Sequence, residues 1–284
     1  MRARAHGAVL LATPWSAPAY MKSNNNLNNG GKLLPPYAKH LLDFTAYMDS
    51  KGAPIYALAA RLPQFHQRAG REVQLLAAES LGFNTALTDP VLNSSAAQYL
   101  SIVGGHLYGV QPKDYPLARS KGKQLWMTEH YTDNTDNTDG NAWPSALGVG
   151  SELHNSMLAN YSGYIWWYIR RSYGLIAENG TVSKRGYVMS QYARFVRPGS
   201  VRIGATAAPY NDVAVSAYKT AGGKLVLVAV NTGTQHRQIT VRVPAGSATA
   251  FTKYSTSSSL NVGYGGKYSV ASGQTVVYVD PQAG

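Results

Sequence analysis

The sequence contains no cysteine, so its fold must stand without disulfides, and the redox compartment in which it works stays open. Acidic residues are few: 14 Asp and Glu against 26 Lys and Arg leave a formal net charge of +12. Long apolar runs are also missing, and no segment approaches the roughly 20 residues that a membrane-spanning helix needs. The chain has 284 residues and 44% hydrophobic content, enough for one large domain or a domain with a smaller partner.

The excess of positive charge favours a polyanionic partner. Nucleic acid is one such partner, but the sequence contains no run of basic residues, no zinc-ligand spacing and no recognised nucleic-acid motif. An acidic polysaccharide suits the charge equally well. The 28 Gly, 20 Tyr and only 14% charged residues are typical of extracellular proteins that act on polysaccharides. We therefore expect a saccharide partner, and no nucleic acid, membrane, metal or cofactor.

The N-terminus superficially resembles the start of a signal peptide. Arg2 and Arg4 precede the short apolar run Ala8–Ala12. This run is too short and leads directly into Thr13–Trp15 without a cleavage region, so no signal peptide is predicted.

In the first two thirds of the chain, the spacing of apolar residues predicts alternating helices and strands. Helices are predicted at Tyr37–Gly52 and from Trp143 and Pro144 through Leu158. Strands are predicted at Ile55–Ala60, Val73–Glu79, Tyr99–His106, Lys123–Tyr131 and from Tyr161 to about Tyr168. Arg61–Gln74 shows no clear period, and no element is predicted there. This order predicts parallel βα repeats of the barrel type.

From Val201 onward the sequence alternates apolar and polar residues without helical spacing. Strands are predicted at Val213–Lys219, Lys224–Asn231, Gln238–Val243, Ala248–Tyr254 and Gln274–Val279. Pro198–Gly199 offers a natural boundary. We therefore predict two domains, with residues 1–199 forming a partial catalytic barrel and residues 200–284 a β-sandwich-like side domain.

Glu129 is the first candidate for chemistry. It ends an apolar alternation through Leu125 and Met127, and a polar loop, Tyr131–Ala142, follows it. Barrel enzymes present catalytic groups at such strand ends, because the strand holds the backbone while the loop stays open to substrate. The alternative is a structural acid held by a neighbouring Arg or Lys.

Aromatic and arginine residues are concentrated in Tyr161–Tyr173, which contains the next predicted strand and the residues after it. Aromatic faces stack on sugar rings, and a carboxylate beside such a strand end indicates a saccharide ligand. Alternation sends Trp166 and Trp167 to opposite sides. One of the two is therefore expected to pack in the core and the other to cover the barrel mouth.

Several segments carry a resemblance to the bacterial glucuronoxylanases of glycoside hydrolase family 30. They are Thr13–Lys22, Ala78–Pro90, Gly104–Gly109, Leu125–Tyr131, Ile165–Gly174, Ser183–Pro198 and Lys253–Gly266. The resemblance implies an α/β plus all-β fold, an incomplete (β/α)8 TIM barrel with a C-terminal side β-domain. It also implies a secreted retaining hydrolase that cuts β-1,4-xylan at glucuronic-acid-branched positions.

The same resemblance implies roles for individual residues. Glu129 matches the family's nucleophile. The glucuronate-holding residues correspond to Tyr131, Trp167, Arg171 and Tyr173. The cleft-lining residues correspond to Trp15, His106 and Tyr108.

The sequence departs from the family where the second catalytic carboxyl group is expected. The family has an Asn-Glu-Pro triplet after the strand that matches Ile55–Ala60, whereas this chain has Arg61–Pro63 and no carboxylate until Glu72. A retaining glycosidase needs an acid/base about 5–5.5 Å from its nucleophile. Two interpretations follow, an impaired hydrolase and a non-catalytic glucuronoxylan-binding remnant. They differ in whether Glu72 or Glu79 reaches Glu129.

Three further departures accompany the missing acid. The family's first barrel strands have no counterpart before Thr13, and the fourth barrel helix is expected to be absent. An open barrel of this kind predicts poor solubility or association, because its strand edges are unpaired. The Ser that the family offers to the glucuronate falls near Asn134 or Thr135.

Overall fold

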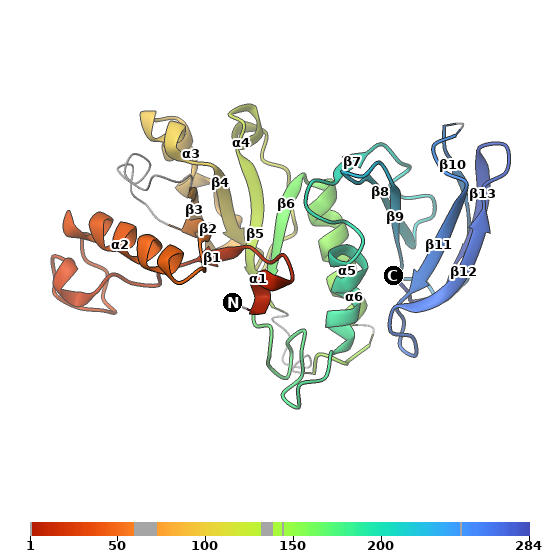
Figure 1. Ribbon diagram of the computed structural model, residues 1–284, viewed down its shortest axis with the longest axis horizontal. Coiled ribbons are helices and arrows are strands. Elements are labelled where there is room, and N and C mark those ends of the chain that lie inside the picture. Colours follow the sequence, from red (N-terminus) through yellow and green to blue (C-terminus); the bar gives the residue numbers. More distant parts are fainter. Residues whose placement is uncertain (1, 60–72, 132–138, 144, 245) are drawn as a thin grey trace. The chain divides into compact units, whose positions relative to one another are not determined.

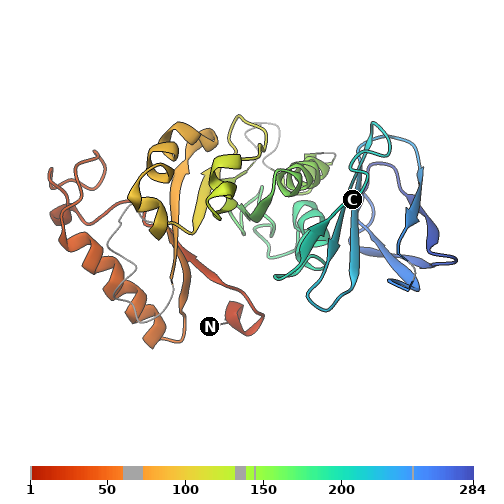
Figure 2. The same ribbon diagram turned by 90° about the horizontal axis from the view of Figure 1, so that it is seen from above.

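The computed structural model describes residues 2–59, 73–131, 139–143, 145–244 and 246–284 (Figure 1, Figure 2). Its α-helices are α1 Arg2–Ala5, α2 Pro36–Ser50, α3 Asp89–Leu92, α4 Pro116–Ser120, α5 Ser145–Leu158 and α6 Lys184–Ala193. Its strands are β1 Leu10–Ala12, β2 Ile55–Ala59, β3 Gln74–Ser80, β4 Ile102–His106, β5 Gln124–His130, β6 Tyr161–Trp166, β7 Val201–Ile203, β8 Val213–Lys219, β9 Leu225–Asn231, β10 Arg237–Arg242, β11 Ala250–Ser255, β12 Gly263–Ser269 and β13 Gln274–Val279.

Six strands form one sheet in sequence order, β1-β2-β3-β4-β5-β6. The pairs β1–β2, β2–β3 and β3–β4 are parallel. Parallel neighbours require crossover connections, so strands in sequence order with helices between them are what barrel repeats produce. The predicted incomplete (β/α)8 barrel is therefore confirmed.

The chain divides into two compact units. The first comprises Met1–Leu107 and Tyr115–Thr128, and the second comprises Tyr108–Asp114 and Glu129–Gly284. In the first unit, α2 packs against β2. Its core cluster contains Ala17, Tyr37, Leu41, Ile55, Leu58, Val73 and Leu75. The predicted helix at Tyr37–Gly52 is thus confirmed, and it ends just before Gly52, whose φ of 67° favours glycine.

In the second unit, α5 packs against α6 and also contacts β8 and β9 (Figure 1, Figure 2). The buried residues Leu153, Tyr192, Tyr218 and Val228 form a cluster from these elements. The predicted all-β texture of the C-terminal region is confirmed by three antiparallel sheets, β7-β8-β9, β10-β13 and β11-β12. A largely apolar cavity of about 790 Å³ is lined by residues of these sheets and of α6.

Several elements differ from the sequence expectations. β6 ends at Trp166, earlier than the expected end near Tyr168. β1 and β7 were not predicted because each is only three residues long. β12 was missed because its glycines weaken the strand pattern. Among the described residues, no helix has both the length and the apolar character needed to cross a membrane.

Candidate active site

Glu129 lies near the end of β5 and is half-buried. The predicted alternation is only partly present in the structure, since Trp126 and Thr128 are buried as well as Leu125 and Met127. A parallel barrel strand has both faces covered, which explains the continuous burial. The strand thereby holds the backbone of Glu129 rigidly.

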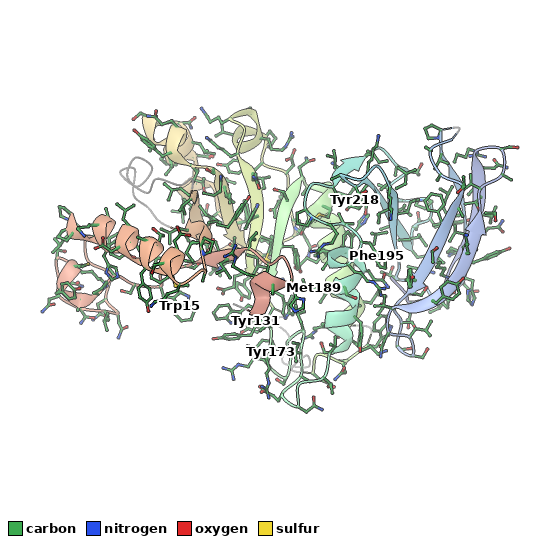
Figure 3. The ribbon with its side chains drawn as sticks, viewed as in Figure 1. Trp15, Tyr131, Tyr173, Met189, Phe195 and Tyr218 are labelled. Atoms are coloured by element: carbon green, nitrogen blue, oxygen red, sulfur yellow. The ribbon has the colours of Figure 1, made fainter. Side chains whose placement is uncertain are left out.

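Tyr108 and two further tyrosines connect the carboxylate of Glu129 to a surface of aromatic rings. The Tyr108 hydroxyl donates a hydrogen bond to Glu129 Oε1 at 3.1 Å. The Tyr108 ring meets the Tyr131 ring edge to face at 5.5 Å. Tyr131 in turn stacks on Tyr173 at 4.8 Å, with an interplanar angle of 22° (Figure 3). Four of the predicted site residues therefore form one contiguous series of contacts.

Next to this series, where the Tyr108 and His130 rings lie 5.1 Å apart, one carboxylate links residues of α5, β5 and β6. Glu152 on α5 accepts a hydrogen bond from the Tyr164 hydroxyl of β6 at 2.5 Å. The same oxygen lies 2.8 Å from Nδ1 of His130 on β5. Burial and the Glu152 carboxylate raise the pKa of Tyr164 well above its ordinary value, so the phenol stays a donor. The sequence prediction missed this network, although the scarcity of acidic residues made Glu152 conspicuous.

The segment after β6 carries the predicted glucuronate-holding residues. The Trp167 amide donates to the His130 carbonyl at 3.0 Å, and the Trp167 ring lies 4.1 Å from the Tyr168 ring. The guanidinium of Arg171 lies 5.0 Å from the centroid of that Tyr168 ring. Tyr168 was not among the predicted site residues, though its place in an aromatic run signalled it. Burial and nearby Tyr131 raise the pKa of Tyr173, which keeps its hydroxyl neutral.

One of the two adjacent tryptophans packs in the core, as predicted. Trp166 is buried, and its Nε1 donates to the Tyr173 carbonyl at 3.3 Å, so it is the core member of the pair. Trp167 is only half-buried. Its predicted position over the barrel mouth stays a prediction.

Trp15 and His106 belong to the first compact unit. The Trp15 side chain is 78% exposed, as a residue that stacks on sugar would need to be. His106 Nε2 lies 3.5 Å from Glu79 Oε2. This pairing fits the expectation that Glu79 is a structural acid at a strand end.

The predictions for Arg61–Pro63, Glu72, Asn134 and Thr135 lie outside the described residues. Within the described part of the chain, no three His, Cys, Asp or Glu side chains gather as a metal site requires. The cavity of the second unit is distinct from this site, because its lining residues include neither Glu129 nor Tyr108, Tyr131 and Tyr173 of the contact series.

Comparison with known proteins agrees with this fold. Residues 199–276 match the glycosyl hydrolase family 30 beta sandwich domain. Glucuronoxylanase XynC of Bacillus subtilis is 40% identical over 288 aligned positions, which cover 90% of this chain and 68% of XynC.

Two solved structures are similar over almost the whole chain. The family 30 subfamily 8 xylanase Xyn30A of Clostridium acetobutylicum is 35% identical with a TM-score of 0.87, and the match covers 99% of this chain and 79% of that one. A family 30 endoxylanase of Clostridium papyrosolvens is 33% identical with a TM-score of 0.86 and the same coverage. These matches confirm the resemblance found in the sequence motifs, and the chain therefore belongs to glycoside hydrolase family 30.

Proposed function

We propose that this glycoside hydrolase acts on xylan that carries glucuronic acid branches, with Glu129 as its nucleophile. The observation that carries the proposal is the contact series from Glu129 through Tyr108 and Tyr131 to Tyr173. It joins a carboxylate suited to attack with aromatic rings suited to a sugar, and the guanidinium of Arg171, which interacts electrostatically with Tyr173, suits an acidic branch. The names of the relatives, glucuronoxylanase and endoxylanase, support the same substrate class. Because polymeric xylan does not cross a membrane, we expect the protein to work outside the cell.

Recognition of the branch rests on charge and ring faces. The Arg171 side chain is exposed, and its guanidinium can bind a glucuronate carboxylate through two parallel hydrogen bonds. The faces of Trp167, Tyr131 and Tyr173 suit sugar rings. The net charge of +12 draws an acidic polymer toward the protein.

In the proposed reaction, a carboxylate oxygen of Glu129 bonds to the anomeric carbon while the glycosidic bond breaks. The Tyr108 hydroxyl orients that carboxylate. The leaving oxygen keeps the electron pair of the broken bond and needs a proton. The sequence offers no carboxylate between Arg61 and Arg71, where the family carries its acid/base. General acid/base catalysis contributes about 10²–10⁴-fold to the rate. Natural xylan should therefore be cleaved more slowly, by about this factor, than by a family member that has the acid/base.

The proposal is tested by comparing a natural substrate, an activated substrate and an added nucleophile. We expect little reducing sugar from glucuronoxylan, but release of phenol from a dinitrophenyl glycoside of a glucuronate-bearing xylooligosaccharide. Dinitrophenolate leaves without a proton, and the glycosyl-enzyme should accumulate because no base activates water. Azide is already anionic, so it can displace Glu129 from the anomeric carbon and yield a β-glycosyl azide.

The control for this experiment is Glu129→Gln, which should abolish both phenol release and azide product. Rapid turnover of glucuronoxylan that is insensitive to azide and is lost in Glu72→Gln would contradict the missing-acid proposal. That result would assign the proton donor to Glu72.

A second candidate function is binding without cleavage, favoured by the same absence of a carboxylate at Arg61–Pro63. Intact-protein mass spectrometry separates the two functions. A mass increase equal to the complete glucuronate-bearing xylooligosaccharyl group, left after dinitrophenolate departs, supports the hydrolase. Saturable binding with no adduct and no phenol supports the binding protein.

A further inference from the structure

Arg185 is a wholly buried arginine in the first turn of α6, with 0% of its surface exposed. Burial lowers the pKa of its guanidinium, so the position carries an energetic cost. Hydrogen bonds and neighbouring groups must compensate for the hydration that a buried guanidinium loses. Its Nη1 donates to the carbonyl oxygen of Tyr173 at 2.9 Å, and its guanidinium lies 5.6 Å from the centroid of the Trp166 ring.

The carbonyl that Arg185 holds belongs to the turn that presents Arg171 and Tyr173. The same oxygen accepts a second hydrogen bond from Trp166 Nε1 at 3.3 Å. The turn is closed by the Gly174 amide, which donates to the Arg171 carbonyl at 2.9 Å. A Cβ on Gly174 would lie 2.7 Å from the Arg171 nitrogen, so the turn has no room for a larger residue.

Two further bonds attach this turn to neighbouring backbone and to α6. Ser183, the N-cap of α6, donates from its hydroxyl to the Gly174 carbonyl at 2.7 Å. The Gly140 amide donates to the Ser172 carbonyl at 2.6 Å, and the Gly140 carbonyl accepts from the Arg185 amide at 3.1 Å. The start of α6 thus holds the turn from its buried side.

We propose that Arg185 is a positioning residue that sets the selectivity of the enzyme for glucuronate-bearing xylan, an inference that rests on the proposed function. Arg185 is too deeply buried to touch a sugar and acts through Tyr173. By fixing that carbonyl, it fixes the Tyr173 ring against Tyr131 and holds Arg171, two residues earlier, in the orientation a carboxylate requires. Without it, the turn would keep the bond from Ser183 but lose the one that fixes the Tyr173 carbonyl to α6.

The selectivity ratio is the readout that separates this role from a merely structural one. In a Glu129→Gln background, which prevents turnover, calorimetry would measure Kd for a glucuronate-bearing xylooligosaccharide and for its unbranched counterpart. Arg185→Met should raise the Kd of the branched ligand about tenfold or more, the scale of one hydrogen bond to a charged group, while the unbranched ligand changes less than about twofold. Arg185→Lys keeps the charge and a donor, and should recover part of the ratio.

Two more variants keep the proposal falsifiable if Arg185→Met does not fold. Trp166→Phe removes the second donor to the same carbonyl but retains a ring under the guanidinium, so it should lower the ratio in the same direction. Arg194→Met is the matched control, because Arg194 lies at the end of the same helix and stacks on Phe195 and Tyr254 instead. It should leave both Kd values unchanged.

The possible outcomes distinguish a failure of the proposed role of Arg185 from a failure of the proposed glucuronate recognition. A parent protein that prefers the branched ligand, with an unchanged preference in folded Arg185→Met or, if that variant does not fold, in Trp166→Phe, would overturn the role of Arg185 alone. A parent protein with equal Kd values for both ligands would overturn the proposed glucuronate recognition and this inference together.

Discussion

At the scale of single residues, two adjacent arginines in the turn after β6 make different contacts. Arg170 donates from its guanidinium to the carbonyl of Glu178 and is thereby tied to the loop that follows. Arg171 is backed by the Tyr168 ring and remains exposed. A planar guanidinium held in this way is suited to bidentate capture of a carboxylate. The geometry therefore favours Arg171 over its neighbour as the carboxylate-binding group.

Arg171→Ala should weaken binding of a glucuronate-bearing xylooligosaccharide by about 1.5–3 kcal/mol, the range for hydrogen bonds to charged groups. A larger loss is not expected, because the side chain is solvated before the ligand arrives. Calorimetric titration with branched and unbranched ligands measures the effect. Arg170→Ala serves as the control and should leave the preference between the two ligands intact. An equal loss of preference in both variants would contradict the assignment.

Gly104 in β4 makes room for the Glu79 carboxylate in the first compact unit. A Cβ at this position would lie 2.6 Å from Glu79 Oε1 and 2.6 Å from a methyl carbon of Leu76. Gly104→Ala should therefore cost about 1–3 kcal/mol of unfolding free energy, as overpacking of a core does. Urea unfolding measures this cost. Gly148→Ala on α5 is a matched control, since nothing lies within 4 Å of its Cβ position.

At the scale of elements, a buried polar cluster joins α5, α6 and β8. The Tyr192 hydroxyl of α6 lies 3.4 Å from Nδ1 of His154 on α5 and 3.3 Å from the Ser216 hydroxyl of β8. Burial, with a smaller contribution from Arg202, lowers the pKa of His154. The helices that support the active site therefore pack best when this imidazole is neutral.

This cluster predicts a loss of stability in acid. The unfolded chain protonates His154 near its ordinary pKa of about 6.5, whereas the folded chain does so only at lower pH. The contribution of His154 is therefore complete above that value and is lost as the pH falls below it, with a slope of at most about 1.4 kcal/mol per pH unit.

The measurement is urea unfolding at pH 7.5 and pH 5.0 for the parent protein and His154→Gln. The glutamine can still accept a hydrogen bond from Tyr192 but does not titrate, so the variant should lose less stability on acidification. His236→Gln is the control, since His236 is largely exposed. Identical pH dependence in the parent and His154→Gln would contradict the prediction.

At the scale of the whole molecule, the dominant feature is a formal net charge of +12. Charge of one sign raises the local concentration of an oppositely charged polymer and speeds its arrival. Salt screens this attraction over a distance of about 10 Å at 0.1 M ionic strength. The acidic branches of the proposed substrate should therefore make its binding sensitive to salt.

Raising NaCl from 50 to 300 mM should weaken binding of polymeric glucuronoxylan by at least about threefold, because the long-range attraction is screened. Affinity electrophoresis or calorimetry at the two salt concentrations measures the change. Xylan from which the glucuronate has been removed is the control and should bind with little dependence on salt. Equal salt dependence for both polymers would contradict a role for net charge.

Much of the architecture could be predicted from the sequence because it follows from local pattern. The alternating helices and strands, the all-β texture after Val201 and the motifs of the family are all readable along the chain. The position of Glu129 at a strand end also follows from periodicity. Short or glycine-rich strands such as β1 and β12 were missed, since three residues or a run of glycines carry too little pattern.

Only the tertiary structure decided which groups meet. Tyr108 reaches Glu129 across 21 positions because it follows β4, the neighbour of β5 in the sheet. Glu152 on α5 reaches His130 across 22 positions because the helix carries its side chain back onto β5. Arg185 has no local feature that assigns it to Tyr173, and the pairing arises where α6 begins behind the turn. Local sequence specifies the type and direction of an element, whereas contacts between distant residues depend on how the elements pack. The sequence by itself determined the family and the strand-end carboxylate. Tertiary packing determined that Tyr108 contacts this carboxylate, that α5 contacts His130 beside it, and that α6 holds the Tyr173 carbonyl.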